Sequence, residues 1–210
     1  MIPLDAIRII SLPHRTDRRE ALLSDLRRAV EARILPDLPM EFVNRYPQHR
    51  TLVPASWPYF ASYWAASREH EEVLGELWAS GSNLALILED DALFLPEFFE
   101  NAVPFYDEVV SDHPDWLAMF IGGVDAYGYE RRSEMVLLNR GSRQCHAYIV
   151  NPAGMWRLRD HLWCNPRQIV DWAYAAMMQV DPCVYRPAHW MVSTREGWSD
   201  SRQVHARRGE

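Results

Sequence analysis

The chain has 210 residues, with 29 acidic and 22 basic side chains, so its net charge is −7 at neutral pH. An acidic balance disfavours proteins that neutralise many nucleic-acid phosphates, and nucleic acid is not expected as a partner. Every basic residue is an arginine, which excludes enzymes that depend on a P-loop lysine or a Schiff-base lysine. The length suits one α/β domain whose core needs no disulfides.

The three cysteines, Cys145, Cys164 and Cys183, are too widely spaced for a zinc knuckle or a disulfide framework. We therefore expect reduced thiols in a cytoplasmic protein. The first residues carry an acid where a signal peptide would be basic, and no stretch approaches the ~18 apolar residues needed to cross a bilayer. No transmembrane segment is expected, while contact with a membrane surface stays open.

The first half of the chain alternates apolar strands with amphipathic helices. β-branched residues predict a buried strand at 6–12 that ends at Pro13, and Thr16 is expected to cap a helix that reaches about Arg33. Three further segments are expected: a strand at 40–43, a loop at 47–58 and a helix at 60–80. Strands that alternate with helices predict a parallel sheet covered on both faces.

The second half is expected to hold shorter strands and further helices. A helix at 96–111 is interrupted or kinked at Pro104, and Asn151 caps a helix that begins at Pro152. Two strands, at 135–138 and 146–150, could pair as neighbours. The remaining elements are a strand at 116–121, a helix at 170–179, a strand at 183–186 and a tail at 189–210 that forms either a lid or a frayed end.

Three adjacent acids, Glu89, Asp90 and Asp91, end the apolar run that begins at Leu84. Carboxylates at the end of a buried strand repel one another, and Mg²⁺ or Mn²⁺ commonly binds such groups together with substrate phosphates. If the strand continues, Glu89 and Asp91 point to one face and Asp90 to the other. The alternative is an acidic surface turn.

Arginines and one histidine are further candidates. Arg15, Arg18 and Arg19 lie close to a helix N-terminus, where guanidinium and backbone N–H groups can hold an anion. The alternative is a solvated helix face paired with neighbouring acids. His70 lies near the apolar stripe of the 60–80 helix, either as a hydrogen-bonded core group or as a site residue.

The carboxyl ends of parallel strands meet at one edge of a sheet, so residues 13–19, 89–91 and 122–125 are expected to gather there. Gly122 and Gly123 would let a ligand or another backbone come close. No G-x-G-x-x-G or G-x-x-x-x-G-K motif is present. A nucleotide would therefore depend on metal and arginine for its phosphates.

Four blocks occur in order along the chain: IISLPHRTDRR, ALILEDDA, CHAYIVNPAG and IVDWAY, followed by VYRP and WSDSRQ. Together they resemble glycosyltransferase family 25, which includes bacterial lipooligosaccharide galactosyltransferases and collagen galactosyltransferases. The chain departs from the family at Ser11 and Leu12, where the family has Asn-Leu. The family's Gly-Cys…Ser-His block is also reduced here to His70 preceded by Glu69.

The resemblance implies a GT-A-like α/β fold in a single domain, 1–210. A Rossmann-like nucleotide-binding half at 1–125 would be joined to a smaller mixed-sheet acceptor half at 126–188 and a tail or lid at 189–210. It implies an inverting transfer of a sugar, commonly galactose, from a UDP-sugar to a glycan or lipooligosaccharide-type acceptor. Mn²⁺ or Mg²⁺ would neutralise the departing diphosphate.

Within this family framework, Asp91 would bind the metal directly, helped by Glu89 or Asp90, which would contact the metal's waters or the donor ribose and sugar. His205 or His189 could add a nitrogen ligand if the tail folds over the site. Asp171, in the block that matches the family's Val-Asp, is the expected general base. Its alternative role is that of an ordinary acid at a helix start, favoured by the macrodipole.

The residues expected from the matched blocks to contact the donor lie near predicted strand ends or in the tail. His146 and Tyr148 are considered as residues of the sugar pocket, although Tyr148 could instead fill the core. The expected donor-binding residues are Leu12, Pro13, Arg15, Arg19, His70, Glu89, Asp90, Tyr148, Asp200 and Arg202.

Two other functions stay open on sequence grounds. One is a catalytically impaired nucleotide-sugar- or carbohydrate-binding protein of the same fold, which the reduced Gly-Cys…Ser-His block allows. The other is a two-metal phosphoesterase or nuclease, which the acidic charge and the lack of further acid clusters disfavour.

Overall fold

The computed structural model describes residues 1–44, 46–195, 197–199 and 204–206, and this part of the chain forms twelve strands and six helices. The strands are β1 (Ala6–Ile10), β2 (Met40–Val43), β3 (Ala85–Glu89), β4 (Ala92–Phe94), β5 (Ala118–Asp125), β6 (Tyr129–Arg131), β7 (Val136–Asn139), β8 (Ser142–Val150), β9 (Val184–Pro187), β10 (Val192–Thr194), β11 (Gly197–Ser199) and β12 (Val204–Ala206). The helices are α1 (Thr16–Glu31), α2 (Tyr46–Thr51), α3 (Ala61–Ala79), α4 (Pro96–Asp112), α5 (Pro152–Cys164) and α6 (Val170–Val180).

One mixed sheet organises the molecule, with strand order β2-β1-β3-β8-β5-β9-β7-β6 and with β10 and β4 joined to it beside β5. β1 pairs in parallel with β2 and β3, and Ile10 lies opposite both Val43 and Glu89. The carboxyl ends of these three strands therefore meet at one edge. The predicted α/β class is confirmed. Strands from 1–125 and 126–188 share this sheet, and the division into two halves stays a prediction.

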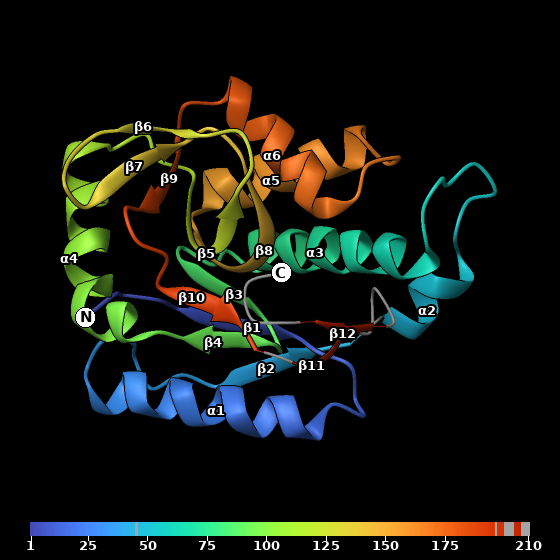
Figure 1. Cartoon of the computed structure of the whole chain (residues 1–210), viewed down its shortest axis with the longest axis horizontal. Coiled ribbons are helices and arrows are strands. Elements are labelled where there is room, and N and C mark those ends of the chain that lie inside the picture. The colour runs from blue at the N-terminus through green and yellow to red at the C-terminus, as the bar shows by residue number, and fades with distance from the viewer. Residues whose placement is uncertain (45, 196, 200–203, 207–210) are drawn as a thin grey trace.

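Alternating side chains divide the core into two layers, one on each face of the sheet. Ile7 and Ile9 of β1 belong to the layer that also contains Leu22 of α1 and Phe105 of α4. Ile87 of β3 belongs to the other layer, which includes residues of α3, α5 and α6. The helices lie accordingly on opposite sides of the sheet in Figure 1. A period of two along buried strands produces this arrangement.

Strand pairing in the second half differs from the sequence prediction. The strands expected at 135–138 and 146–150 are not neighbours, because β7 pairs with β6 and β9 while β8 pairs with β3 and β5. β8 is nine residues long and mostly buried. A long apolar strand fits the centre of the sheet, where both of its edges and both of its faces are covered.

The predicted cap of α1 is wrong, and α4 is not interrupted, while a kink at Pro104 stays a prediction. Thr16 does not cap α1: it is the first helical residue, Arg15 occupies the cap position, and no side-chain cap hydrogen bond is present there. Pro104 does not interrupt α4, which continues through it to Asp112. The apolar face of α4 packs against the sheet, and this packing outweighs the loss of one backbone hydrogen bond.

Segments expected to be loop or tail contain additional elements. α2 forms within the predicted loop at 47–58, and β10 lies in the predicted tail. β10 pairs antiparallel with β4, and the Arg195 N–H donates to the Asp91 carbonyl at 2.7 Å. The start of the predicted tail is therefore part of the main sheet. Its backbone is hydrogen-bonded to the backbone of the acidic triplet at Asp91.

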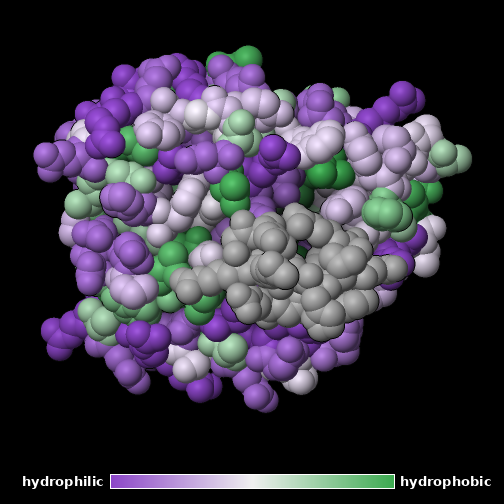
Figure 2. Space-filling model, viewed as in Figure 1, coloured by the Kyte–Doolittle hydropathy of each residue, from purple (hydrophilic) through white to green (hydrophobic). Residues whose placement is uncertain are grey.

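The surface is polar on the face that Figure 2 shows, with hydrophobic residues scattered between hydrophilic ones. Among the described helices, none has the length and hydropathy that crossing a bilayer would require.

The junction between α5 and the sheet depends on two neighbouring residues. The predicted cap is confirmed: the Asn151 side-chain oxygen accepts a hydrogen bond from the Gly154 N–H at 2.8 Å. Gly154 lies so close to the sheet that a Cβ atom there would stand 2.0 Å from the Leu117 carbonyl oxygen. Only glycine allows α5 this approach.

Gly154→Ala should lower the free energy of unfolding by about 1–3 kcal/mol, the usual cost of overpacking, because backbone has to move. Gly75→Ala is the matched control, since its new Cβ would meet only the flexible Arg159 side chain and helix propensity improves. Urea denaturation of both variants measures the difference. An equal effect at the two positions would contradict the packing explanation.

Candidate active site at the edge of the parallel strands

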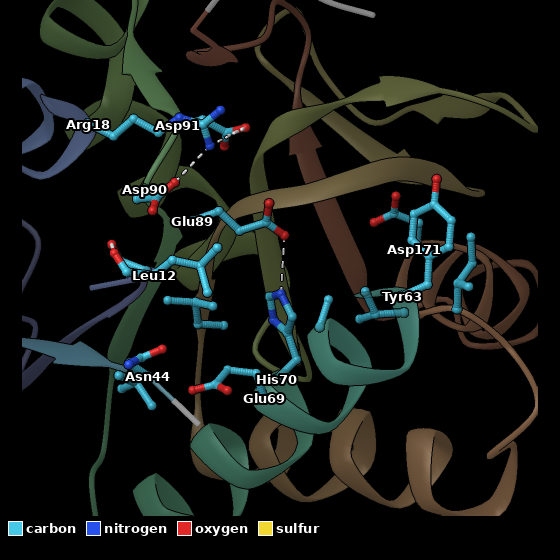
Figure 3. A pocket seen from close by; sticks show the side chains of 16 residues that line it. Leu12, Arg18, Asn44, Tyr63, Glu69, His70, Glu89, Asp90, Asp91 and Asp171 are labelled. Atoms are coloured by element: carbon cyan, nitrogen blue, oxygen red, sulfur yellow. Dashed lines mark hydrogen bonds and ion pairs between the residues drawn. The ribbon is translucent and has the colours of Figure 1, made fainter. Parts of the chain in front are cut away.

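A cavity opens where β1, β2 and β3 end, between the first turns of α1 and the helices α3 and α6 (Figure 3). Parallel strands deliver their last residues to this edge, and helix N-termini approach it from the connections. The described residues that line it are Ile10, Ser11, Leu12, Arg18, Val43, Asn44, Tyr63, Ala66, Glu69, His70, Glu89, Asp90, Asp91, Ile169, Val170 and Asp171.

Negative charge dominates the cavity. Among the described lining residues, five are carboxylic acids and one is an arginine: Glu69, Glu89, Asp90, Asp91 and Asp171 against Arg18. β3 ends at Glu89 and a turn follows before β4. The strand does not continue through the acids, so the predicted alternation of faces does not apply, and all three acids reach the same cavity.

Glu89 is held by a histidine of α3. The His70 Nε2 atom lies 3.3 Å from Glu89 Oε1, and His70 Nδ1 lies 3.0 Å from the Tyr148 hydroxyl. Desolvation disfavours the Glu89 carboxylate, but the hydrogen bond and charge of His70 outweigh it and hold the pKa of Glu89 below its usual value. Both ring nitrogens of the buried imidazole are engaged, which fixes its orientation.

Arg18 faces the other two acids from the first turn of α1. Its guanidinium lies 3.0 Å from Asp90 Oδ1 and 3.7 Å from Asp91 Oδ2. Desolvation nevertheless raises the pKa of Asp90. Desolvation and the Glu89 charge raise the pKa of Asp91 to about 7. The buried Asp91 Oδ1 atom has no hydrogen-bond partner among the described residues, which leaves a ligand atom available for a cation.

Asp171 enters from the start of α6, on the far side of Glu89 and His70 from Asp91 in Figure 3. Its Oδ1 accepts a hydrogen bond from the Cys145 N–H at 3.2 Å and lies 3.2 Å from the Cys145 thiol. Its place in the first turn of the helix favours a negative charge. The cavity thus presents carboxylates on two opposing sides.

Six of the expected site residues meet at this cavity: Leu12, His70, Glu89, Asp90, Asp91 and Asp171. Of the three candidate arginines near the start of α1, Arg18 lines it, while Arg15 and Arg19 do not. Arg15 pairs with Asp17 at 3.3 Å, and Arg19 donates to the Ser11 hydroxyl at 2.7 Å and lies over the Phe42 ring. Arg15, at the cap position, and Arg19, on α1, are thus both engaged with neighbouring residues.

Other expected residues lie elsewhere. Pro13 does not line the cavity, and Tyr148 is buried behind it with its hydroxyl on His70. His189 is exposed and away from the lining. Asp200 and Arg202 lie outside the described residues, as does the side chain of His205 in β12.

Gly122 and Gly123 lie against packed side chains. A Cβ at Gly122 would lie 2.5 Å from His146 Nε2, and one at Gly123 would lie 3.0 Å from the Trp190 ring. The sequence predicted that a ligand or another backbone would come close to these glycines. In the structure the side chains of His146 and Trp190 lie there instead. His146 is buried with its Nε2 3.2 Å from the Val192 carbonyl oxygen, and residues 122–125 do not line the cavity.

Asn44, Tyr63 and Cys145 are polar residues at or beside the site that the sequence did not single out, and Arg18 was a candidate only together with Arg15 and Arg19. Arg18 was one of three equivalent arginines, because helical spacing alone does not say which face meets the acids. Cys145 lies behind the cavity because β8 is irregular: Gln144 has a φ of 63°, and the β5–β8 register shifts around Gly122. No pattern in the sequence marks such a shift.

No protein-family model matches the chain, and no curated protein matches it significantly. Several solved structures are similar at low identity. A glycosyltransferase involved in the glycosylation of the major capsid of PBCV-1 has 10% identity and a TM-score of 0.43, over 78% of this chain and 67% of that one. A197 from STIV has 8% identity and a TM-score of 0.47, over 95% and 92%. An apo UDP-glucose pyrophosphorylase has 9% identity and a TM-score of 0.46, over 87% and 72%. Similarities at this level identify no family. The function is therefore inferred from the residues that line the cavity.

The raised pKa of Asp91 makes stability depend on pH. Because its pKa is about 7 in the folded protein against the usual 3.8 of an aspartate, the folded state binds an extra proton between these pH values. That stabilisation is complete below the unfolded pKa and is lost as pH rises through 7.

Asp91→Asn, which is always neutral, should gain stability over the wild type between pH 5 and pH 8 by about 1 kcal/mol or more. Urea denaturation in chelator at the two pH values measures this. Asp17→Asn is the control, because the exposed Asp17 has a lowered pKa and stays ionised over that range. Parallel pH profiles for wild type and Asp91→Asn would show that Asp91 does not titrate there.

Proposed function

We propose that the chain is an inverting, metal-dependent glycosyltransferase of the GT-A type. It would move a sugar from a UDP-sugar to a hydroxyl group of a glycan, and the resemblance to family 25 makes galactose the first sugar to test. The observation that carries the proposal is the charge of the cavity, in which five carboxylic acids face one arginine. A diphosphate can enter such a place only together with cations.

Asp91 and Glu89 fit the role of ligands for a hard divalent ion. Asp91 Oδ1 is buried without a hydrogen-bond partner among the described residues, and carboxylate oxygens are the ligands that Mg²⁺ and Mn²⁺ prefer. The ion would supply charge neutralisation of the departing diphosphate. Arg18, held in place by Asp90 at 3.0 Å, would contact the phosphate oxygens from the opposite side.

The ends of β1 and β2 would hold the nucleoside. Leu12, Val43 and Asn44 follow one another along this edge of the cavity, where they offer apolar surface and one amide to a base or ribose. Pro13, Arg15 and Arg19 stay predicted donor contacts, and Arg15 and Arg19 are at present paired with Asp17 and Ser11.

Asp171 would act as the general base. It lies across the cavity from Asp91 in Figure 3, and the Cys145 N–H holds one of its oxygens. The carboxylate would take the proton of the acceptor hydroxyl as that oxygen attacks the anomeric carbon, while the bond to the diphosphate breaks on the opposite side. Attack from the opposite face gives inversion.

The metal-dependent part is tested by calorimetric titration of the chain with UDP, with and without Mn²⁺. UDP should bind in the presence of Mn²⁺ and not in its absence, and Asp91→Asn should abolish the metal-dependent binding. Asp37→Asn, at an exposed position away from the cavity, should bind like the wild type. Equal UDP binding with and without the ion would refute the metal-dependent mechanism.

The base is tested by Asp171→Asn, which should bind UDP and Mn²⁺ normally while sugar transfer falls by a factor on the order of 10² or more. Transfer and hydrolysis of a panel of nucleotide sugars, with glycan and lipooligosaccharide acceptors, provide the measurement. Asp107→Asn, an exposed acid on α4, is the control. Full activity of Asp171→Asn would remove the assignment, and donor binding without turnover by the wild type would favour the impaired binding protein.

A further inference from the structure

A second set of ligand atoms lies at the inner wall of the cavity. His70 Nε2 from α3, Glu89 Oε1 from β3 and Cys145 Sγ from β8 all lie within 4.8 Å of one another. The imidazole and the thiol are buried, while the carboxyl group faces the cavity. Three different ligand types from three separate elements converge on one point.

We propose that His70, Glu89 and Cys145 form a binding site for a soft divalent ion, Zn²⁺. The site differs in chemistry from the hard-ion site proposed at Asp91 and shares only Glu89 with it. Thiolate and imidazole ligands favour Zn²⁺, whereas Mg²⁺ and Mn²⁺ favour oxygen. Zinc binding here does not depend on whether the chain transfers sugars.

The distances between the ligand atoms suit a tetrahedral ion. His70 Nε2 lies 3.3 Å from Glu89 Oε1 and 3.7 Å from Cys145 Sγ, and Cys145 Sγ lies 4.0 Å from Glu89 Oε1. Around Zn²⁺ with bonds of about 2.0–2.1 Å to nitrogen and oxygen and about 2.3 Å to sulfur, such pairs stand about 3.3–3.6 Å apart. The side chains need to close by only a few tenths of an ångström.

The surroundings orient the ligands for this role. The Tyr148 hydroxyl lies 3.0 Å from His70 Nδ1, which turns Nε2 toward Glu89 and Cys145. Metal-bound histidines typically have their second nitrogen held in this way. Asp171 Oδ1 lies 3.2 Å from the thiol and can serve as the fourth ligand, or leave that position to water.

Charge also favours an ion at this point. Glu89 and Asp171 both lie within 4.0 Å of Cys145 Sγ, so two acids are held around one sulfur atom. On binding, the thiol gives its proton to solvent and becomes the thiolate that coordinates the ion. The charges of Zn²⁺, thiolate and the Glu89 carboxylate then cancel. Glu89 and Asp171 line the cavity, which provides a path from solvent.

Cobalt substitution tests the site in the full chain. Cys164→Ser with Cys183→Ser leaves Cys145 as the only thiol, since the chain has three cysteines. Co²⁺ added to this metal-free double variant should produce a thiolate-to-cobalt charge-transfer band and tetrahedral visible bands that saturate at one equivalent, and Zn²⁺ should abolish them. Absence of the charge-transfer band at saturating Co²⁺ would overturn the proposal.

Further substitutions in the same background assign the ligands. Cys145→Ser should remove the charge-transfer band, and His70→Gln should weaken Co²⁺ binding on the order of tenfold or more. If either variant does not fold, the band of the double variant still identifies Cys145, because no other thiol is present. Retention of the band in folded Cys145→Ser, or unchanged affinity in folded His70→Gln, would refute the assignment.

Asp91→Asn in the same background separates the two sites. It should keep the cobalt band while it loses Mn²⁺-dependent UDP binding. Loss of the cobalt band in this variant would refute the proposal that the His70–Glu89–Cys145 site does not include Asp91. Failure of UDP to bind the wild type would refute the proposed transferase mechanism and leave the cobalt result unaffected.

Discussion

Electrostatic repulsion at the edge of the parallel strands is the constraint on which the site depends. Five carboxylic acids and one arginine line the same cavity, and like charges close together raise one another's pKa when they are acids. The protein relieves part of this repulsion through Arg18, through His70 and through a proton on Asp91, whose pKa is about 7. The cations proposed for the cavity would neutralise further negative charge.

The backbone holds the acids together in spite of this repulsion. The Asp90 N–H donates to the Ile10 carbonyl of β1 at 3.1 Å, and the Arg195 N–H donates to the Asp91 carbonyl at 2.7 Å. The turn between β3 and β4 is therefore tied to the sheet from both sides, by a strand near the start of the chain and by residues that follow β10. Core packing on both faces of β3 provides the free energy that keeps the charged turn in place.

Glu89 links the two kinds of metal chemistry proposed for the cavity. Toward Asp91 its surroundings are carboxylates and a guanidinium, which suit a hard ion and a diphosphate. Toward the interior its neighbours are an imidazole and a thiol, which suit a soft ion. Glu89 lies between the solvent-facing wall of the cavity and its buried wall. A metal ion bound at one of the two proposed sites would therefore compete for this carboxylate with an ion at the other.

The sequence by itself determined many of the elements and brought several candidate site residues to notice. A β-branched run predicted β1, a continuous apolar run predicted β3 with the acids at 89–91 after it, and Asn151 marked the start of α5, because these features depend on local geometry. Tertiary structure alone decided which elements became neighbours. A period of two or 3.6 fixes the face that a residue occupies but not the partner it meets. β8 therefore came to lie between β3 and β5, Arg18 and not Arg15 or Arg19 reached the acids, and an irregularity near Gln144 placed Cys145 against His70, Glu89 and Asp171.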